Sequence, residues 1–260
     1  MVSVKKDKKV CLVTGARTGI GKSISELLAK NGYRVILAPK RSGDCRESIN
    51  ELTQKGFEVA ELVLDLSKPE ELKKTLEEAI SIWGTIDILI NNGAVVDPIS
   101  KLGNLPLEHL VHSNEINFIS PLMIINHCWD YLKKSKGRIL NILSGAAIHP
   151  VEGWTTYCAT KAALHMVNQQ AHLEGIEHNI TSIGISPGMV DTSMQGRIRK
   201  SGINHISKVK KSDLLSTEVP ANLALWCLSP EVKDLSGKMI SLNDPLIEKR
   251  FKKWQFRRSQ

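Results

Sequence analysis

Short apolar runs alternate with amphipathic stretches from one end of the chain to the other. The apolar runs are rich in Val, Ile and Leu and cover residues 9–14, 34–38, 58–64, 86–91, 137–143, 180–186 and 237–242. Nearly continuous apolar character is typical of strands that are buried on both faces of a parallel sheet.

Between these runs, apolar residues recur with the period of an amphipathic helix. The predicted helices span residues 20–31, 46–55, 69–83, 121–134, 156–173 and 218–228. Gly32 and Gly56 follow the first two of them, where a C-terminal cap favours glycine. Ser67 and Glu70 have the spacing of a capping box, which predicts the start of the third helix.

Strands that alternate with helices predict βαβ units with right-handed crossovers. We therefore expect an α/β fold, a Rossmann-type doubly wound parallel sheet of about seven strands with helices on both faces. No repeat or low-complexity linker interrupts residues 1–260, which are predicted to form one domain. Residues 189–216 are too long for an ordinary strand-to-helix connection and are expected to form a substrate-binding loop or lid.

Composition excludes several classes of protein. Hydrophobic residues make up 42% and charged residues 24%, which is ordinary for a globular domain. No apolar run approaches the roughly 18–20 residues of a membrane span, and the first strand begins too early for a signal peptide to precede it. Five scattered cysteines without a CxxC pair indicate reduced thiols in a cytoplasmic protein and no metal site.

The formal net charge of +8 is concentrated at the two ends. Residues 248–260 hold six Lys or Arg and one Glu, residues 1–9 hold four Lys and one Asp, and the rest of the chain holds 25 of each sign. Residues 247–260 are therefore predicted to be a basic, solvated tail, although Phe251, Trp254 and Phe256 could dock on a partner subunit. A weak contact with a polyanion stays open, but no motif predicts nucleic-acid binding.

A glycine-rich turn follows the first strand directly, in TGARTGIG at residues 14–21. Glycines at 15, 19 and 21 permit a tight turn and a close backbone approach, and the following helix offers N–H groups and a positive dipole end to a diphosphate. After the first strand of a βαβ unit, this indicates dinucleotide binding. The spacing is GxxxGxG instead of the commoner GxGxxG, and a merely tight turn is the alternative.

Tyr157 and Lys161 stand four positions apart in TTYCATKAAL. On the predicted helix they would share one face, about 5–6 Å apart at Cβ. Alone, such a pair is more often part of an ordinary surface helix, so its meaning depends on the rest of the chain.

Five ordered motifs together resemble the short-chain dehydrogenase/reductase family. They are TGxxxGIG at the first turn, Asn91-Asn92 after the fourth strand, Ser144 after the fifth, Tyr157-xxx-Lys161 on the next helix, and PGMVDT at 187–192 after the sixth. The resemblance extends from Lys9 to about Pro245. Within the family, LSGAAIHPVEGWTTYCATKAAL, SPGMVDTSMQ and LSGKMISLNDP look most like the sepiapterin reductase and benzil reductase branch.

The chain departs from the family pattern at two points. The usual Asn-Asn-Ala-Gly reads Asn-Asn-Gly-Ala at 91–94, and both exchanged residues are small, so little loss is expected. The pterin-reducing members hold their substrate with a carboxylate near the C-terminal end, for which Asp244 is the nearest candidate here. The resemblance therefore does not predict pterin specificity.

The resemblance assigns chemistry to these side chains. Tyr157 would donate a proton when a carbonyl is reduced, with its pKa, ordinarily about 10, lowered by the Lys161 ammonium and a nicotinamide cation. Ser144 would hydrogen-bond the substrate oxygen as negative charge develops there. Asn117 matches the family's asparagine that holds a relay water, with Asn114 as a competing assignment. The alternatives are a turn residue for Ser144 and a buried amide for Asn117.

The implied cofactor is NADP(H). Pro39 follows the second strand, where an acidic residue would accept hydrogen bonds from the 2′-hydroxyl of NAD, and Lys40, Arg41 and Arg17 would favour a 2′-phosphate unless they are simply solvated. Asp65 would accept a hydrogen bond from the adenine amino group, or it is only a helix cap. The predicted cofactor contacts are Gly15, Arg17, Thr18, Gly19, Ile20, Gly21, Lys40, Arg41, Asp65, Leu66, Asn91, Gly93, Tyr157, Lys161, Pro187, Gly188, Val190 and Thr192.

These residues predict an NADPH-dependent reductase of a small-molecule ketone or diketone, which the resemblance suggests is a homodimer or homotetramer. His149, Trp154, Met189 and Met194 are predicted to line the substrate pocket, although ordinary packing explains them equally well. Two alternatives stay open. One is a sensor or scaffold protein that binds the dinucleotide without catalysis, a class that usually lacks the Tyr or the Lys. The other is an alcohol dehydrogenase that works in the oxidative direction.

Overall fold

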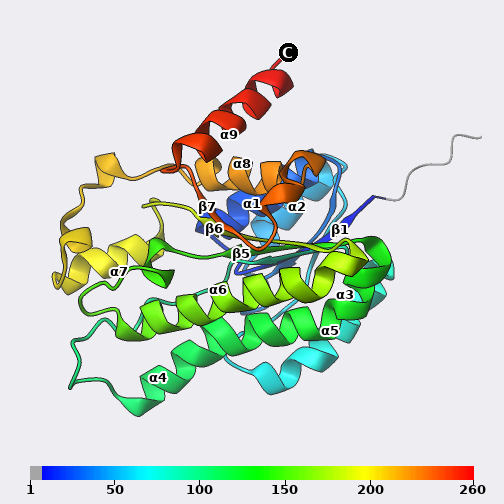
Figure 1. The fold of residues 1–260 in the computed structure, drawn as a ribbon. Helices are drawn as coiled ribbons and strands as arrows, with labels where there is room; N and C mark the ends of the chain where they lie inside the picture. The colour runs from blue at the N-terminus through cyan, green and yellow to red at the C-terminus, as the bar shows by residue number, and fades with distance from the viewer. Residues whose placement is uncertain (1–7) are drawn as a thin grey trace, which may run out of the picture.

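The computed structural model describes residues 8–260 (Figure 1). Residues 1–7, which make up most of the basic N-terminal end noted in the sequence, lie outside the described residues. The strands are β1 Val10–Thr14, β2 Arg34–Ala38, β3 Val59–Glu61, β4 Ile88–Asn91, β5 Arg138–Ile142, β6 Thr181–Ser186 and β7 Met239–Ser241. The α-helices are α1 Gly19–Lys30, α2 Arg46–Gln54, α3 Leu72–Trp83, α4 Leu107–Asn114, α5 Ser120–Ser135, α6 Thr155–Gly175, α7 Ser193–Ser201, α8 Glu218–Cys227 and α9 Pro245–Arg258.

The strands form one parallel seven-stranded sheet in the order β3-β2-β1-β4-β5-β6-β7. The predicted doubly wound sheet is therefore confirmed. The order reverses between β1 and β4, and in open α/β sheets the crevice at the carboxyl ends of the strands on either side of such a point is the usual place for a ligand.

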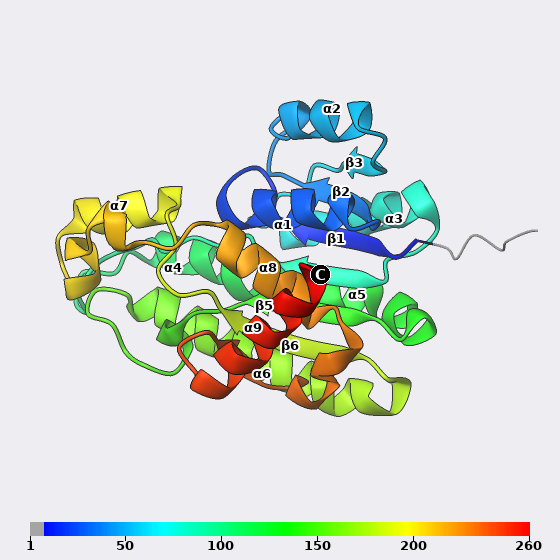
Figure 2. The same ribbon diagram turned by 90° about the horizontal axis from the view of Figure 1, so that it is seen from above.

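Each strand buries side chains on both faces of the sheet. Along β1, Val10 and Leu12 enter the hydrophobic core on one face, and Cys11 and Val13 enter the core on the other. Helices α3, α5 and α6 cover the first face and α1, α2, α8 and α9 the second (Figures 1 and 2). This two-sided burial explains why the strands read as continuous apolar runs.

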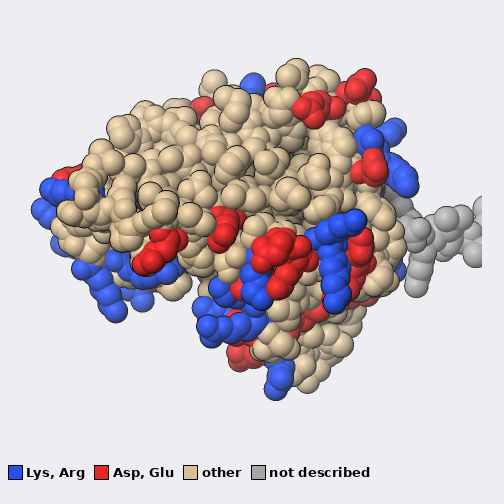
Figure 3. Space-filling view, turned by 90° about the horizontal axis from the view of Figure 1, so that it is seen from below, with Lys and Arg blue, Asp and Glu red and all other residues tan. Residues whose placement is uncertain are grey.

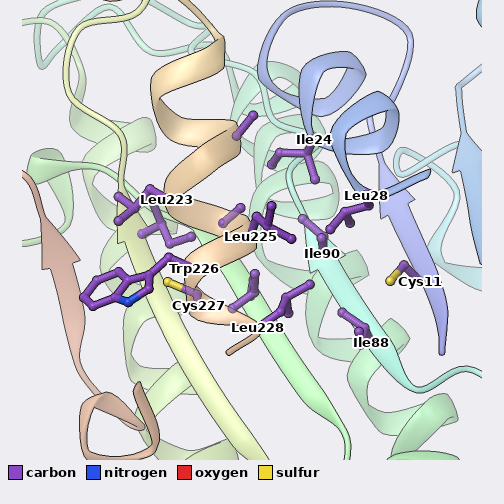
Figure 4. Packing of buried hydrophobic residues seen from close by; sticks show 14 of the residues in the cluster. Cys11, Ile24, Leu28, Ile88, Ile90, Leu223, Leu225, Trp226, Cys227 and Leu228 are labelled. Carbon is purple, nitrogen blue, oxygen red and sulfur yellow. The ribbon is translucent and has the colours of Figure 1, made fainter. Parts of the chain in front are cut away.

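Helix α8 is the most buried helix of the second face. Figure 4 shows its Leu225 on the side of Ile24 of α1 and Ile90 of β4, with Trp226 turned towards the opposite side. Trp226 is only 1% exposed. A helix that is apolar on nearly every side is expected to be enclosed by other elements, and α8 lies between the sheet, α1 and α9.

The prediction that residues 247–260 are a solvated tail is wrong. All but the last two belong to α9, which packs on α8 and buries Ile247, Phe251 and Trp254. The Phe251 ring lies 5.8 Å from Trp226 and 5.9 Å from Trp254 between ring centroids. The charged majority of the segment hid a narrow apolar stripe with helical spacing.

Ion pairs also hold α9 on the body of the protein. Arg250 makes a bidentate pair with Asp234, at 2.7 and 2.9 Å, and Arg257 contacts Glu231 at 2.6 Å. Asp244 accepts hydrogen bonds from the first backbone N–H groups of α9 and is its N-cap. Asp244, the candidate carboxylate for holding a pterin substrate, thus has a structural role at the start of α9.

Residues 189–216 are partly ordered into α7 and two short 3₁₀ turns, and their substrate-binding role stays a prediction. One further expectation about local structure was wrong. Ser67 does not open a capping box, because its N–H and hydroxyl both donate to Asp65. The glycine caps were predicted correctly, since Gly32 and Gly56 both have φ near +80°.

Sequence periodicity did not predict the short helix α4, which continues as a π-helical turn over Glu115–Ile119 before α5. No helix among residues 8–260 is both long and apolar enough to cross a bilayer.

Candidate active site

A cavity of about 670 Å³ opens along the carboxyl ends of the strands. Its walls come from the glycine loop, the segments after β2 to β6, and α6 and α7. Of the predicted cofactor residues, those that line it are Gly15, Arg17, Thr18, Gly19, Ile20, Lys40, Asp65, Leu66, Gly93, Tyr157, Lys161, Pro187, Gly188, Val190 and Thr192. Gly21, Arg41 and Asn91 do not line it.

The glycine loop is held tightly against the end of β4. Gly15 has φ of +63°, and a Cβ at this position would come within 2.7 Å of the Cα of Gly93. Gly19 also has positive φ, so both positions require glycine. Gly21 does not face the cavity, and a Cβ there would meet the carbonyl oxygen of Gly15 at 2.4 Å. Its role is to let the loop fold back on itself.

Asn92, not Asn91, connects this loop to β4. The Asn92 amide donates hydrogen bonds to the carbonyl oxygens of Thr14 and Gly15, at 3.0 and 3.2 Å. Asn91 lies inside the sheet, where its amide donates to Asn141 at 2.9 Å. The sequence pointed to the Asn-Asn pair but not to the member that faces the cavity, because a one-residue shift at a strand end moves a side chain to the other face.

Tyr157 and Lys161 lie on one face of α6, at the inner end of the cavity. Both side chains are buried, with exposed fractions of 7% and 2%. The Lys161 Nζ atom lies 5.7 Å from the centre of the Tyr157 ring and donates a hydrogen bond to the carbonyl oxygen of Ile142 at 2.7 Å. The predicted i, i+4 pair therefore shares one environment, as helical geometry requires.

Burial shifts both groups towards their neutral forms. It raises the pKa of Tyr157 to about 12, while the hydrogen bond with Ser144 acts in the opposite direction. It lowers the pKa of Lys161 to about 8, so this ammonium is still mostly protonated at neutral pH. Without a nicotinamide, desolvation outweighs the contact with Ser144. The lowering of the Tyr157 pKa by Lys161 together with a nicotinamide cation stays a prediction.

Ser144 follows β5 and lies beside Tyr157. Its hydroxyl oxygen accepts a hydrogen bond from the N–H of Ala146 at 3.2 Å, which caps a short 3₁₀ turn. Ser144 thus has the turn role, and its role towards a substrate oxygen stays a prediction. Ser144 and Tyr157 both line the cavity.

Asn117 is buried in the π-helical turn and does not line the cavity. Its amide oxygen accepts the N–H of Val95 at 2.9 Å, and its amide nitrogen donates to the Val95 carbonyl and the Thr160 hydroxyl. It therefore ties the segment after β4 to α6. The competing Asn114 bonds only within its own helix, to Leu110, among the described residues.

The predicted phosphate-reading cations lie near carboxylates at the opposite end of the cavity. Lys40 Nζ lies 3.3 Å from Asp65 and from the Ser67 hydroxyl, and Arg17 Nε lies 3.7 Å from Asp44. Burial acts to raise the pKa of Asp65, but hydrogen bonds from Ser67 and Lys40 bring it below its ordinary value. Asp65 is thus an ionised acceptor at the cavity wall.

Arg41 is exposed and does not line the cavity. Pro39, which replaces the acidic residue expected of an NAD-binding site, does line the cavity.

All four predicted substrate-pocket residues, His149, Trp154, Met189 and Met194, line the cavity. Trp154 is 5% exposed and packs edge-on against Tyr157, with ring centroids 5.5 Å apart. Apolar walls of this kind suit the body of an organic substrate, with a few polar groups to orient it.

Sequence reasoning missed further lining residues in the segment after β6, among them Gln195, Arg197 and His205. Arg197 pairs with Asp97, which does not line the cavity, at 2.9 Å. Figure 3 shows Lys and Arg side chains gathered at the end of the molecule where α7 lies. The only sequence indication was the length of the segment.

The shape and chemistry of the cavity fit a dinucleotide. At one end, glycines without Cβ atoms allow a ligand to approach the backbone closely. The N-terminus of α1 at this end offers backbone N–H groups, and the Thr18 side chain does not cap them. The other end presents a phenol, a hydroxyl and an ammonium. This combination defines a nucleotide-dependent enzyme of the doubly wound class, with acid–base groups beside the nucleotide site.

The sequence-family comparison is specific. The family model for short chain dehydrogenases matches residues 9–202, so the chain belongs to this family and is an oxidoreductase. The chain is 31% identical over 255 residues to the diacetyl reductase, (S)-acetoin forming, of Staphylococcus epidermidis. The matched region covers 92% of this chain and 98% of that protein.

Solved structures show the same fold. The KRED1-Pglu enzyme superposes with a TM-score of 0.79 at 27% identity, over 90% of this chain and all of that one. An actinorhodin polyketide ketoreductase variant with NADPH superposes with a TM-score of 0.83 at 23% identity, over 91% and 96%. At that identity the second likeness concerns the fold alone.

Proposed function

We propose that this protein is an NADPH-dependent carbonyl reductase acting on a small ketone or diketone. The observation that carries the proposal is the convergence of Ser144, Tyr157 and Lys161 at the buried end of one cavity. The name of the diacetyl reductase relative supports a carbonyl substrate. The finer resemblance to the sepiapterin and benzil reductase branch stays a prediction.

Tyr157 is the proton donor in this proposal. Its raised pKa keeps the phenol protonated at neutral pH, which is the form that an acid needs when a carbonyl is reduced. When bound, the reduced nicotinamide would supply the hydride to the carbonyl carbon. The phenol Oη then gives its proton to the carbonyl oxygen, while the Ser144 hydroxyl donates a hydrogen bond to the same oxygen.

Lys161 keeps a positive charge beside the phenol. Its ammonium is fixed by the Ile142 carbonyl, and this charge stabilises the phenolate that forms once the proton has left. The family resemblance also gives it the nicotinamide ribose as a partner. Asn117 acts indirectly, by holding the Val95 segment of the cavity wall on α6.

The glycine loop and the start of α1 would hold the diphosphate, and Asp65 with Leu66 the adenine end. Lys40 and Arg17 at the cavity wall, together with Pro39 in place of an acid, support NADP(H) over NAD(H). We also propose a cytoplasmic location, for which the reduced state of all five cysteines is consistent support.

A homodimer or homotetramer is part of the same proposal. Large apolar side chains are exposed on the outer sides of α4, α5 and α6, at Leu107, Val111, Leu122, Met166 and Leu173. Exposed apolar groups of this kind on adjacent helices favour association with a second copy.

The test is nicotinamide absorbance at 340 nm, followed with NADPH or NADH and a panel of diketones, quinones, steroids and pterins. Turnover of at least one carbonyl with NADPH is expected. Tight NADPH binding without turnover of any panel member would favour the sensor or scaffold alternative, and turnover confined to alcohols with NADP⁺ would favour the oxidative one.

A further inference from the structure

The loop that joins β2 to α2, residues 39–45, carries two of the three cations that the proposed function places near the 2′-phosphate of NADP(H). Lys40 lines the cavity, and Arg41 follows it. The third cation, Arg17 of the glycine loop, lies 3.7 Å from Asp44 of the same loop. The conformation of this loop therefore affects where all three cations stand.

Glu61, the last residue of edge strand β3, holds the loop by two backbone groups. Its Oε1 atom accepts the N–H of Gly43 at 2.7 Å, and its Oε2 atom accepts the N–H of Cys45 at 2.9 Å. Glu61 is itself anchored by its register with Leu37 of β2. Hydrogen bonds to an ionised carboxylate are roughly twice as strong as neutral ones, so this contact fixes the loop firmly.

The residues after Glu61 fix the beginning of the loop in the same way. The Leu64 N–H donates to the Pro39 carbonyl oxygen at 2.8 Å, and Lys40 contacts both Asp65 and Ser67 at 3.3 Å. The loop is thus attached at both ends to one continuous segment. Among residues 8–260, a charged side chain bound to backbone N–H groups holds only the Glu61 end of the loop.

We propose that Glu61 is a positioning residue for recognition of the 2′-phosphate, because it holds residues 39–45 in the conformation that presents Lys40 and Arg41 and keeps Asp44 beside Arg17. This inference rests on the proposed function, since it concerns the NADP(H) end of the same cavity. Glu61 itself does not line the cavity and acts through the loop.

Charge and positioning predict opposite effects of losing this carboxylate. A negative charge near the site repels a phosphate, so its removal alone would strengthen phosphate binding. Release of the loop would weaken it, because the cations would lose their fixed places and ordering them on binding costs entropy. The sign of the change therefore separates a positioning role from a purely electrostatic one.

The experiment is calorimetric titration of the full chain with adenosine 2′,5′-bisphosphate and with adenosine 5′-monophosphate, which differ only in the 2′-phosphate. Wild type should prefer the bisphosphate. We expect Glu61→Gln to weaken bisphosphate binding by about fivefold, as loss of one charged hydrogen bond implies, and to leave the monophosphate within about twofold. In activity assays, the KM for NADPH should rise while kcat stays constant.

Glu58→Gln is the matched control. Glu58 lies three residues earlier, and its substitution removes the same charge. In the described part of the chain, the Glu58 carboxylate pairs with Arg34 and Lys8 and makes no contact with the loop. Its variant should bind both nucleotides as wild type does. Glu61→Ala, checked for folding by thermal melting, removes both bonds and should have the larger effect.

Bisphosphate binding that is unchanged or tighter in both Glu61 variants would overturn the positioning role. A wild-type protein that binds the two nucleotides equally would instead overturn the NADP(H) preference of the proposed function, so the two failures are distinguishable.

Discussion

The ammonium of Lys161 and the ring of Tyr157 stand on one face of α6, with Nζ 5.7 Å from the ring centre, and both are almost fully buried. Burying an ionisable pair costs free energy unless the groups are compensated. In the described structure, Lys161 makes its close hydrogen bond to one backbone carbonyl, that of Ile142. Burial of Lys161 therefore lowers the free energy of unfolding, as is common at sites that are arranged for function.

Lys161→Met should make the protein more stable at pH 7 and inactive. Lowering the pKa from its ordinary 10.5 to about 8 means that the folded state disfavours the charged form. Each pKa unit is about 1.4 kcal/mol, and the Ile142 carbonyl loses a partner that is worth roughly 1–2 kcal/mol. A net gain of about 1–2 kcal/mol is expected in urea denaturation.

The pH dependence of this gain has a definite sign. Between about pH 8 and 10.5 the unfolded chain binds more protons at Lys161 than the folded one, so wild-type stability rises with pH there. The advantage of Lys161→Met should therefore shrink from pH 7 to pH 10. Lys74→Met, an exposed substitution on α3, should show no such trend. A variant that is destabilised at pH 7 would contradict the desolvation cost.

Tyr157→Phe should bind cofactor almost normally and lose carbonyl reduction by at least about 100-fold, which is the usual worth of a general acid. The phenyl ring keeps the edge contact with Trp154, so folding should be unaffected. Tyr131→Phe, a partly exposed tyrosine of α5, is the control. If the Tyr157 variant keeps more than a tenth of wild-type turnover while chemistry limits the rate, the acid has been wrongly assigned.

The repeating pattern of strands and helices, and the order of the motifs, were sufficient to predict the sheet and the members of the central site. The sheet follows from local chemistry, because buried parallel strands need continuous apolar runs. The site residues were named by the family resemblance, and helical spacing explains only why Tyr157 and Lys161 share a face. Ser144, Tyr157 and Lys161 all line one cavity.

What the sequence could not give depends on tertiary contacts. Whether Asn91 or Asn92 faces the cavity is decided by where β4 ends. The stripe Ile247, Phe251 and Trp254 was masked by the charges around it, which Asp234 and Glu231 neutralise only after folding. The charged segment of α9 thus packs on the rest of the protein because acidic residues before β7 pair with it.

The buried stripe of α9 makes a second stability prediction. Phe251→Ala should lower the free energy of unfolding by about 3–5 kcal/mol, since it empties a site packed between two tryptophans. Phe256→Ala, the same change on the same helix but at a 63% exposed position, should stay within about 0.5 kcal/mol. Guanidinium denaturation measures both. Equal costs at the two positions would show that α9 does not pack as the structure has it.

The preference between dinucleotides is the prediction that most directly tests the cationic end of the cavity. Wild type should favour NADPH over NADH by at least about tenfold in kcat/KM, or roughly 1.4 kcal/mol. Pro39 cannot accept hydrogen bonds from a 2′-hydroxyl, and Lys40 and Arg17 stand at the cavity wall, where they can bind a phosphate. Lys40→Ala should therefore reduce the preference mainly by raising the KM for NADPH. Arg41→Ala should act in the same direction but less strongly, because Arg41 is exposed and outside the cavity lining.

Steady-state kinetics with both cofactors and one carbonyl substrate give the ratio for each variant. Equal efficiency of NADPH and NADH in wild type, or a preference for NADH, would mean that these cations do not read the phosphate.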